Sequence, residues 1–238
     1  MPMSDSPFDE LAQRYDAWFE SPQGAAIFAV EVECVRGLLQ GVPRPWLEVG
    51  VGTGRFAQAL GIDEGLDPSR AVLELADGRG VQTRLGRAEE MPHEQRSFGG
   101  LVMVVTICFL DDPRAALREC ARVMSDDGAL IVGLVPAASA WGRHYAEQGS
   151  EGHPFYSQAT FYTCRQVADL ASAVGLQLDT ARSCLFTPPG APIDAEEPPP
   201  EGIFEEAGFV AMRFRKTGTE PYLHRKPITI GLGDVQEV

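Results

Sequence analysis

Short apolar runs alternate with helical patterns between residues 46 and 135. The runs have the length of single strands, and the segments between them repeat their apolar residues at helical spacing. Strands are expected at 46–49, 65–67, 81–85, 101–105 and 129–135. The run at 101–105 is apolar throughout, as is typical of a central strand buried on both faces. This order predicts an α/β fold with a mostly parallel sheet, helices on both faces and right-handed connections.

The N-terminal region predicts two helices that precede the sheet. Its apolar residues follow at spacings of three, one, three, three and one, and they are Phe8, Leu11, Ala12, Tyr15, Trp18 and Phe19. This spacing indicates an amphipathic helix with an aromatic-rich face, ending near Pro22. A second helix is expected over 24–39, ended by the Gly- and Pro-rich stretch 41–45. We therefore expect a helical cap over about 8–40, ahead of a core over 46–216.

The alternation of strand-like and helical patterns ends after the fifth expected strand. Residues 137–160 carry no clear period and are rich in aromatic and polar side chains, so an irregular segment is expected there. Thr163 and Gln166 form a capping-box pair that starts the next helix. Two β-rich stretches follow, at 176–186 and 209–214. They predict an antiparallel hairpin at the sheet edge, which brings the sheet to seven strands.

Length and composition are those of one α/β domain. The chain has 238 residues, of which 44% are hydrophobic and 23% charged, enough for a sizeable core. The domain is expected over 1–216, and the tail 217–238 has no assignment. A net charge of −14 without a basic stripe argues against a nucleic-acid partner. No apolar run approaches the roughly 20 residues that span a bilayer, which argues against a membrane protein.

The five cysteines are widely spaced and form no CxxC pair. Together with the lack of a signal peptide, this spacing is typical of reduced thiols in a cytoplasmic protein, and no metal site is expected. We interpret the cysteines as small buried hydrophobic residues. A thiolate trio for a soft metalloid is the less favoured alternative. The sequence leaves the oligomeric state open.

The main candidate for chemistry is the glycine-rich turn after the first expected strand. Glycines at 50, 52 and 54 let the backbone turn tightly and let its N–H groups approach a ligand closely. The dinucleotide-binding fingerprint needs a glycine at 55, where this chain has Arg55. Two acids accompany the turn, Glu48 just before it and Asp67 at the end of the second strand. Asp67 can accept two hydrogen bonds from a ribose diol.

These residues resemble the motifs of the class I methyltransferases that use S-adenosylmethionine (SAM), especially the small-molecule group similar to the ubiquinone and menaquinone biosynthesis enzymes. The resemblance covers about 8–215, and its glycine motif is the most specific part. It implies a Rossmann-like fold, SAM as cofactor and methyl transfer to a small molecule. The positions implied to bind the cofactor are Tyr15, Glu48, Gly50, Gly52, Thr53, Gly54, Asp67, Ala88, Glu89 and Thr106.

The resemblance also implies a place for several of these residues. The three glycines would lie under the methionine part of SAM, and Asp67 would hold the ribose hydroxyls. Ala88 and Glu89 would lie beside the adenine, and Thr106 at the exit of the fourth strand. Tyr15 belongs to an aromatic motif that would fold over the cofactor. The alternatives are a helix cap for Asp67, a solvated loop acid for Glu89 and an ordinary core residue for Tyr15.

Methyl transfer from a sulfonium is an in-line displacement, so the enzyme mainly aligns the acceptor with the methyl carbon. A base is needed only if the acceptor must lose a proton. His153 is the best catalytic candidate, with an ordinary pKa of about 6.5; a structural or surface histidine is the alternative. Two other functions stay open, a dinucleotide-dependent oxidoreductase on the same fold and a non-catalytic SAM-binding module. The sequence does not identify the acceptor.

Two aromatic segments lie outside the alternating strand–helix core. They are the N-terminal helix with Tyr15 and Trp18, and the expected loop at 141–161. An open parallel sheet places its ligand crevice at the carboxyl ends of the strands, where this loop starts. We therefore expect the two segments to cap the acceptor site together.

Overall fold

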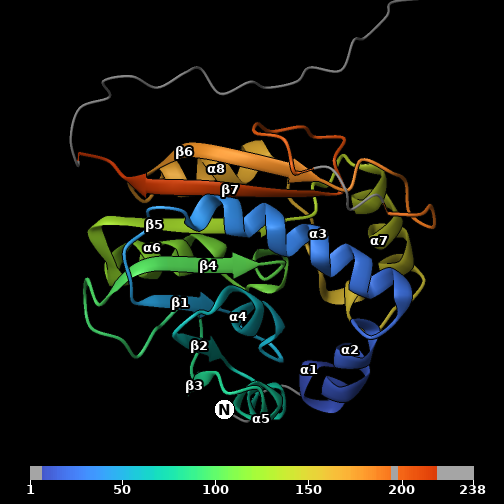
Figure 1. Ribbon diagram of the computed structural model, residues 1–238, viewed down its shortest axis with the longest axis horizontal. Coiled ribbons are helices and arrows are strands. Elements are labelled where there is room, and N and C mark those ends of the chain that lie inside the picture. Colours follow the sequence, from blue (N-terminus) through green and yellow to red (C-terminus); the bar gives the residue numbers. More distant parts are fainter. Residues whose placement is uncertain (1–6, 194–197, 219–238) are drawn as a thin grey trace, which may run out of the picture.

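Seven strands form a single sheet in the computed structural model, which describes residues 7–193 and 198–218 (Figure 1). The strands are β1 (Trp46–Val49), β2 (Glu64–Asp67), β3 (Gln82–Leu85), β4 (Phe98–Val104), β5 (Met124–Leu134), β6 (Leu176–Cys184) and β7 (Phe209–Lys216). Their order is β3-β2-β1-β4-β5-β7-β6. Strands β1 to β5 pair in parallel, and β7 pairs antiparallel with both β5 and β6. The predicted Rossmann-like sheet and its antiparallel C-terminal pair are confirmed.

Helices cover both faces of the sheet. They are α1 (Pro7–Glu10), α2 (Ala12–Trp18), α3 (Pro22–Leu39), α4 (Arg55–Leu60), α5 (Arg70–Gly78), α6 (Pro113–Val123), α7 (Ala140–Ser150) and α8 (Cys164–Ser172), with short 3₁₀ turns η1 (Ile107–Phe109) and η2 (Tyr156–Gln158). Helices α3 and α4 lie in front of the sheet and α6 and α8 behind it, while α1, α2 and α7 gather beyond its right-hand end (Figure 1). The parallel strands β1 and β4 point toward that end.

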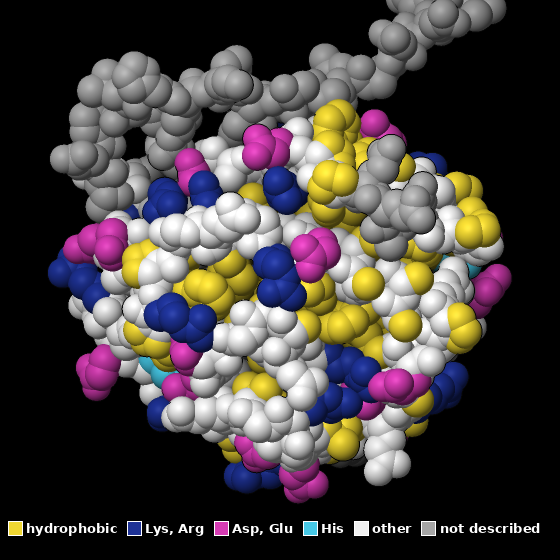
Figure 2. All heavy atoms as spheres, in the orientation of Figure 1, with side chains coloured by type: hydrophobic (Ala, Val, Ile, Leu, Met, Phe, Trp, Pro, Cys, Tyr) yellow, Lys and Arg dark blue, Asp and Glu magenta, His cyan; other side chains and the backbone are white. Residues whose placement is uncertain are grey.

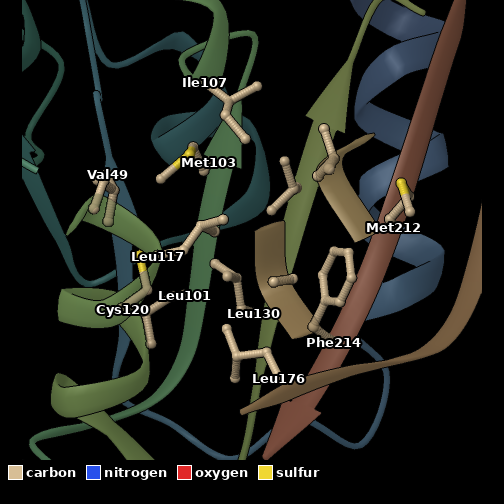
Figure 3. Packing of buried hydrophobic residues seen from close by; sticks show 14 of the residues in the cluster. Val49, Leu101, Met103, Ile107, Leu117, Cys120, Leu130, Leu176, Met212 and Phe214 are labelled. Carbon is tan, nitrogen blue, oxygen red and sulfur yellow. The ribbon is translucent and has the colours of Figure 1, made fainter. Parts of the chain in front are cut away.

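Each face of the sheet has its own apolar core. Behind it, Leu101, Leu130 and Phe214 from three strands meet Leu117 of α6 and Leu176 of β6 (Figure 3). In front, the inner side of α3 packs on the other faces of the same strands. All five cysteines are free and buried, as their interpretation as small hydrophobic residues requires. Burial of both faces explains why β4 is apolar throughout and why β5 is apolar from Ala129 onward.

Helix ends follow local sequence signals, with one correction. Thr163 and Gln166 form both bonds of the predicted capping box at α8. Pro22, expected to end the first helix, instead opens α3, because proline fits the first turn of a helix and the Ser21 hydroxyl accepts from the Gly24 N–H at 3.0 Å. The first helix is also split, at Leu11, into α1 and α2.

Of the irregular segment expected at 137–160, and as a loop at 141–161, the second half is confirmed, because residues 151–160 hold no regular element except the short turn η2. The first half is wrong. It contains the regular helix α7, whose first turn is capped by the Ser139 hydroxyl accepting from the Gly142 N–H at 2.9 Å. Only Trp141 and Gly142 of this helix are fully buried. Its inner face looks onto a cavity rather than onto a packed core, so aromatic and polar residues replace the apolar stripe that reveals a helix in a sequence.

The surface carries mixed charges. Lysine and arginine side chains alternate with acidic ones over the face shown in Figure 2, without a continuous basic stripe. Within 7–193 and 198–218, no helix is long and apolar enough to cross a membrane. Even α3, with 18 residues, includes Glu31, Glu33 and Arg36.

Candidate active site

A cavity of about 590 Å³ lies at the carboxyl ends of the parallel strands. Its floor includes Gly50 after β1, Val105 after β4 and Val135 after β5. Its aromatic lining consists of Phe8, Tyr15, Trp18, Phe19, Phe56, Phe109, Trp141, Tyr145, Phe155, Tyr156 and Phe161. An open α/β sheet places its ligand crevice at this edge, and a volume of this order suits a small ligand.

The three glycines of the turn serve different purposes. All have left-handed backbones, with φ of +74° at Gly50, +52° at Gly52 and +81° at Gly54. A Cβ at Gly50 would lie 2.3 Å from the Thr106 methyl, and one at Gly54 2.8 Å from the Ala76 Cβ. At Gly52 the nearest atom is 3.8 Å away, on the ring of Tyr15. Packing therefore requires the outer two glycines, whereas Gly52 faces the open cavity.

Asp67 braces the glycine turn from the neighbouring strand. Its carboxylate accepts from the Gly52 N–H at 3.0 Å and from the Ser69 N–H at 2.9 Å. Ser69, not Asp67, caps α5, so the helix-cap alternative is wrong. Burial raises the pKa of Asp67 to about 6, although these two hydrogen bonds act to lower it. The charge of Asp9 adds to the rise. Asp67 does not line the cavity but holds a residue that does.

Glu48 is a buried acid with an unused oxygen. Its side chain lines the cavity, the residue is only 2% exposed, and Oε2 has no hydrogen-bond partner within the described ranges. Burial raises the pKa of Glu48 well above its usual range, a backbone hydrogen bond from Ala57 opposes the shift, and the charge of Asp67 adds to it. A buried, unpaired carboxyl oxygen is costly unless a ligand donates to it.

Thr53 and Ala88, both implied cofactor positions, lie outside the cavity lining. Thr53 is buried, and its side chain helps to lower the pKa of Asp16. Ala88 is 6% exposed and packs in the core behind the sheet. Both side chains therefore support the loops around the cavity rather than face it.

Glu89 and Thr106 also lie beside the cavity rather than in its lining. Glu89 accepts from the Asp111 N–H at 3.2 Å, and its side chain is 15% exposed, so it is not a solvated loop acid. The Thr106 hydroxyl donates to the Val104 carbonyl at 3.0 Å, with the Gly50 carbonyl at 3.3 Å. Thr106 thus joins the exit of β4 to the glycine turn.

The exit of β4 is strained. Val105, a β-branched residue, has φ of +50° and lines the cavity, although left-handed backbone is unfavourable for such a side chain. Its N–H donates to the Gly133 carbonyl of β5 at 2.8 Å, which fixes this conformation. Strain of this kind persists where the surroundings impose it, often at ligand sites. No sequence signal at a valine indicates it.

Two segments far apart in the sequence meet over the cavity. The ring of Phe155 lies 5.2 Å from the ring of Phe8 and 5.6 Å from the ring of Tyr15. The rings of Phe8 and Tyr15 are 5.5 Å apart. These contacts join α1 and α2 to the segment between α7 and η2. The structure thus brings together the two aromatic segments expected to form a cap.

Asp16 anchors α2 to the core. Its carboxylate receives two hydrogen bonds of 2.8 Å from Arg55 and one of 2.7 Å from Arg79. Partial burial acts to raise the pKa of Asp16, but hydrogen bonds from Arg55, Thr53 and Arg79 hold it well below its usual range. The bidentate geometry and the limited exposure, 16% for each of the Asp16 and Arg55 side chains, make this a strong ion pair.

Asp16→Asn should lower the free energy of unfolding by about 1–3 kcal/mol, because two partly buried guanidinium groups lose their counter-charge. Chemical denaturation measures this change. Glu20→Gln is the matched control, since Glu20 contacts the same Arg55 but is 72% exposed, and it should have little effect. Because the folded-state pKa of Asp16 is depressed, its contribution is present above pH of about 4 and is lost as the pH falls further. Equal stability of the two variants would contradict the anchor.

His153, the predicted catalytic residue, lines the cavity and is half-buried. Its ring stacks on Tyr156, with centroids 4.4 Å apart and planes 18° apart. Its Nδ1 lies 3.5 Å from the Tyr156 N–H. Burial and the charge of Arg14 lower its pKa. The imidazole is therefore neutral at pH 7, as a base must be.

Glu31 of α3 is a cavity residue that the sequence reasoning missed. It is 6% exposed and lines the cavity. Burial alone raises its pKa to about 8, and no hydrogen bond from residues 7–193 or 198–218 opposes that shift. The available signal was its spacing, because Glu31 falls on the buried stripe of Ile27, Cys34 and Leu38. An acid on an otherwise apolar stripe marks a buried titratable group.

Comparisons with known proteins agree with this architecture. The family model described as "Methyltransferase domain" matches residues 47–132. An uncharacterised protein of Mycobacterium tuberculosis is 40% identical over 221 residues, covering 93% of this chain and 77% of the relative. The demethylmenaquinone methyltransferase of Thermotoga maritima is 29% identical over 133 residues, covering 52% of this chain and 58% of that enzyme.

A solved structure extends the similarity over nearly the whole fold. It is a SAM-dependent methyltransferase of Thermotoga maritima described as a possible histamine N-methyltransferase. It is 36% identical, covers 89% of this chain and 98% of its own, and superimposes with a TM-score of 0.79. The sequence identity and the structural superposition point to the same family. The chain belongs to the class I SAM-dependent methyltransferases.

Proposed function

We propose that this enzyme transfers the methyl group of SAM to a small molecule that enters the aromatic cavity. The carrying observation is the lining of that cavity, with strand ends on one side and the two aromatic segments on the other. Its volume of about 590 Å³ lies within the range of small-molecule sites. The Thermotoga relatives, described as a demethylmenaquinone methyltransferase and a possible histamine N-methyltransferase, support a small acceptor.

The glycine end of the cavity fits SAM. The unpaired Oε2 of Glu48 can accept from the ammonium group of the methionine part, and Gly52 presents open space where a side chain would stand. Asp67 retains lone pairs beyond those that Gly52 and Ser69 use, and these can accept the ribose hydroxyls. Ala88, Glu89 and Thr106 would act through the loops that they hold.

SAM supplies an electrophilic methyl group on a sulfonium, and its leaving sulfur needs no protonation. The chain's own contribution is therefore to orient the acceptor and exclude water. Tyr15, Phe8 and Phe155 cover the cavity for that purpose. For an acceptor hydroxyl that must lose its proton, we propose His153 as the base, because it is neutral and reaches the cavity.

The test is to incubate the enzyme and SAM with two fractions of a cell extract, separated by ultrafiltration into metabolites and macromolecules. Formation of S-adenosylhomocysteine (SAH) should follow the metabolite fraction, and Gly52→Val should abolish it. Methyl incorporation into protein or RNA, with none into metabolites, would contradict a small-molecule acceptor. SAM binding without turnover in either fraction would favour the non-catalytic module.

A further inference from the structure

Two acids from different elements line the cavity, and only one of them belongs to the glycine turn. Glu48 lies directly before that turn, and the charge of Asp67 acts on it. Glu31 comes from α3, and its charge acts on Tyr145, Tyr156 and Cys184. Tyr15, unlike Tyr145 and Tyr156, is influenced by both acids. All three residues line the same cavity, and we call the part lined by Glu48 the donor end and the part lined by Glu31 the second end.

The second end is aromatic and holds no cation that pairs with Glu31 among the described residues. The rings of Tyr145 and Tyr156 lie 4.5 Å apart, and Trp141 lies 5.8 Å from Tyr145. Burial raises the pKa of both tyrosines, that of Tyr156 to about 12, so their phenols stay neutral. In the described ranges, the acid at this end is buried without a hydrogen-bond partner.

We propose that the methyl acceptor is an amine, whose basic nitrogen is held by the carboxylate of Glu31 against the faces of Tyr145, Tyr156 and Trp141. A buried carboxyl group without a partner is unfavourable until a donor reaches it. Aromatic faces attract the cationic form of an amine. This inference rests on the proposed function and names its substrate class.

The assignment also accounts for the proton. The amine gives one proton to the Glu31 carboxylate, and its freed lone pair forms the N–CH₃ bond while the C–S bond of SAM breaks and its electron pair goes to sulfur. An alkylammonium has a pKa of about 10 and an ordinary glutamic acid one of about 4.3, so transfer to an exposed carboxylate is strongly uphill. Burial brings the pKa of Glu31 to about 8 and narrows that gap. For an amine, His153 is then not required as the base.

Binding to the SAH-loaded protein tests the proposal with two ligands of one skeleton, 2-phenylethylamine and 2-phenylethanol. Calorimetry should show the amine binding at least about 10-fold more tightly, as a charge-assisted contact predicts. Glu31→Gln should reduce this preference to about 3-fold or less. Glu33→Gln, on the same helix with a 59% exposed side chain paired to Arg36, should preserve it.

SAH affinity is measured on every variant, so that the two ends of the cavity are tested separately. Unchanged SAH affinity in Glu31→Gln, with the amine preference lost, supports the proposal. Equal binding of amine and alcohol to the wild type, binding of neither, or a preference that survives in Glu31→Gln overturns it. A loss of SAH affinity in Glu31→Gln also overturns it, because Glu31 would then serve the donor. Failure of the wild type to bind SAH would instead contradict the proposed donor site.

Discussion

Replacing Gly52 with valine should weaken SAM binding by at least about 100-fold and abolish methyl transfer. Gly52 faces open cavity with φ of +52°, so a valine would add strain and fill the space that the ligand needs. Calorimetry with SAH measures the binding, and circular dichroism checks that the variant is folded.

Gly61→Val is the matched control for this substitution. Gly61 also has a left-handed backbone, with φ of +67° and no atom within 4 Å of the position that a Cβ would take, but it ends α4 outside the cavity lining. It should therefore lose stability like Gly52→Val and still bind SAH. Normal SAH binding by a folded Gly52→Val variant would show that the ligand does not lie on the glycine turn.

Asp67→Ala should weaken SAM binding by roughly 10–100-fold, the value of a lost charge-assisted contact. The structure adds that Asp67 also braces Gly52, so the alanine variant loses this hydrogen bond as well. In Asp67→Asn the amide oxygen can still accept one of the two backbone hydrogen bonds. The stability of this variant should therefore change less than its SAM affinity. Unchanged affinity by calorimetry in both variants would remove Asp67 from the site.

The pKa of Asp67 gives this assignment a second readout. Burial raises it to about 6, and the ionised carboxylate is the better acceptor for ribose hydroxyls. SAM affinity should therefore decrease as the pH falls through about 6 in the wild type. The same titration of Asp67→Asn should lack this transition, and a transition that persists would have to come from another group.

The sequence predicts the sheet well because its signals are local. The apolar run at β4 reflects burial on both faces, and the capping box at Thr163 and Gln166 is read from residues three apart. Helix α7 was not predicted because its inner face lines a cavity. The residues on that face are polar and aromatic, as suits a ligand, and do not form the apolar stripe of a helix packed on a core.

The candidate site likewise contains residues that local sequence patterns predict and residues that they do not. The glycines, Glu48 and Asp67 are contiguous with predicted strands, and their places follow from the sheet edge. Glu31 and the strained Val105 depend on contacts between segments far apart in the sequence, α3 with β5 to β7 and β4 with β5. Such contacts leave no local sequence pattern, apart from the acid Glu31 on the otherwise apolar stripe of α3.

The central claim is that donor and acceptor meet inside one cavity, covered by α1, α2 and the segment from α7 to η2. Hydrogen exchange with and without SAH tests it most directly, because every covering segment is read in one experiment. We expect slower exchange at 8–20 and at 141–161, together with the glycine turn and Asp67. Protection confined to the glycine turn and Asp67 would contradict the claim and mean that the acceptor enters an open cleft.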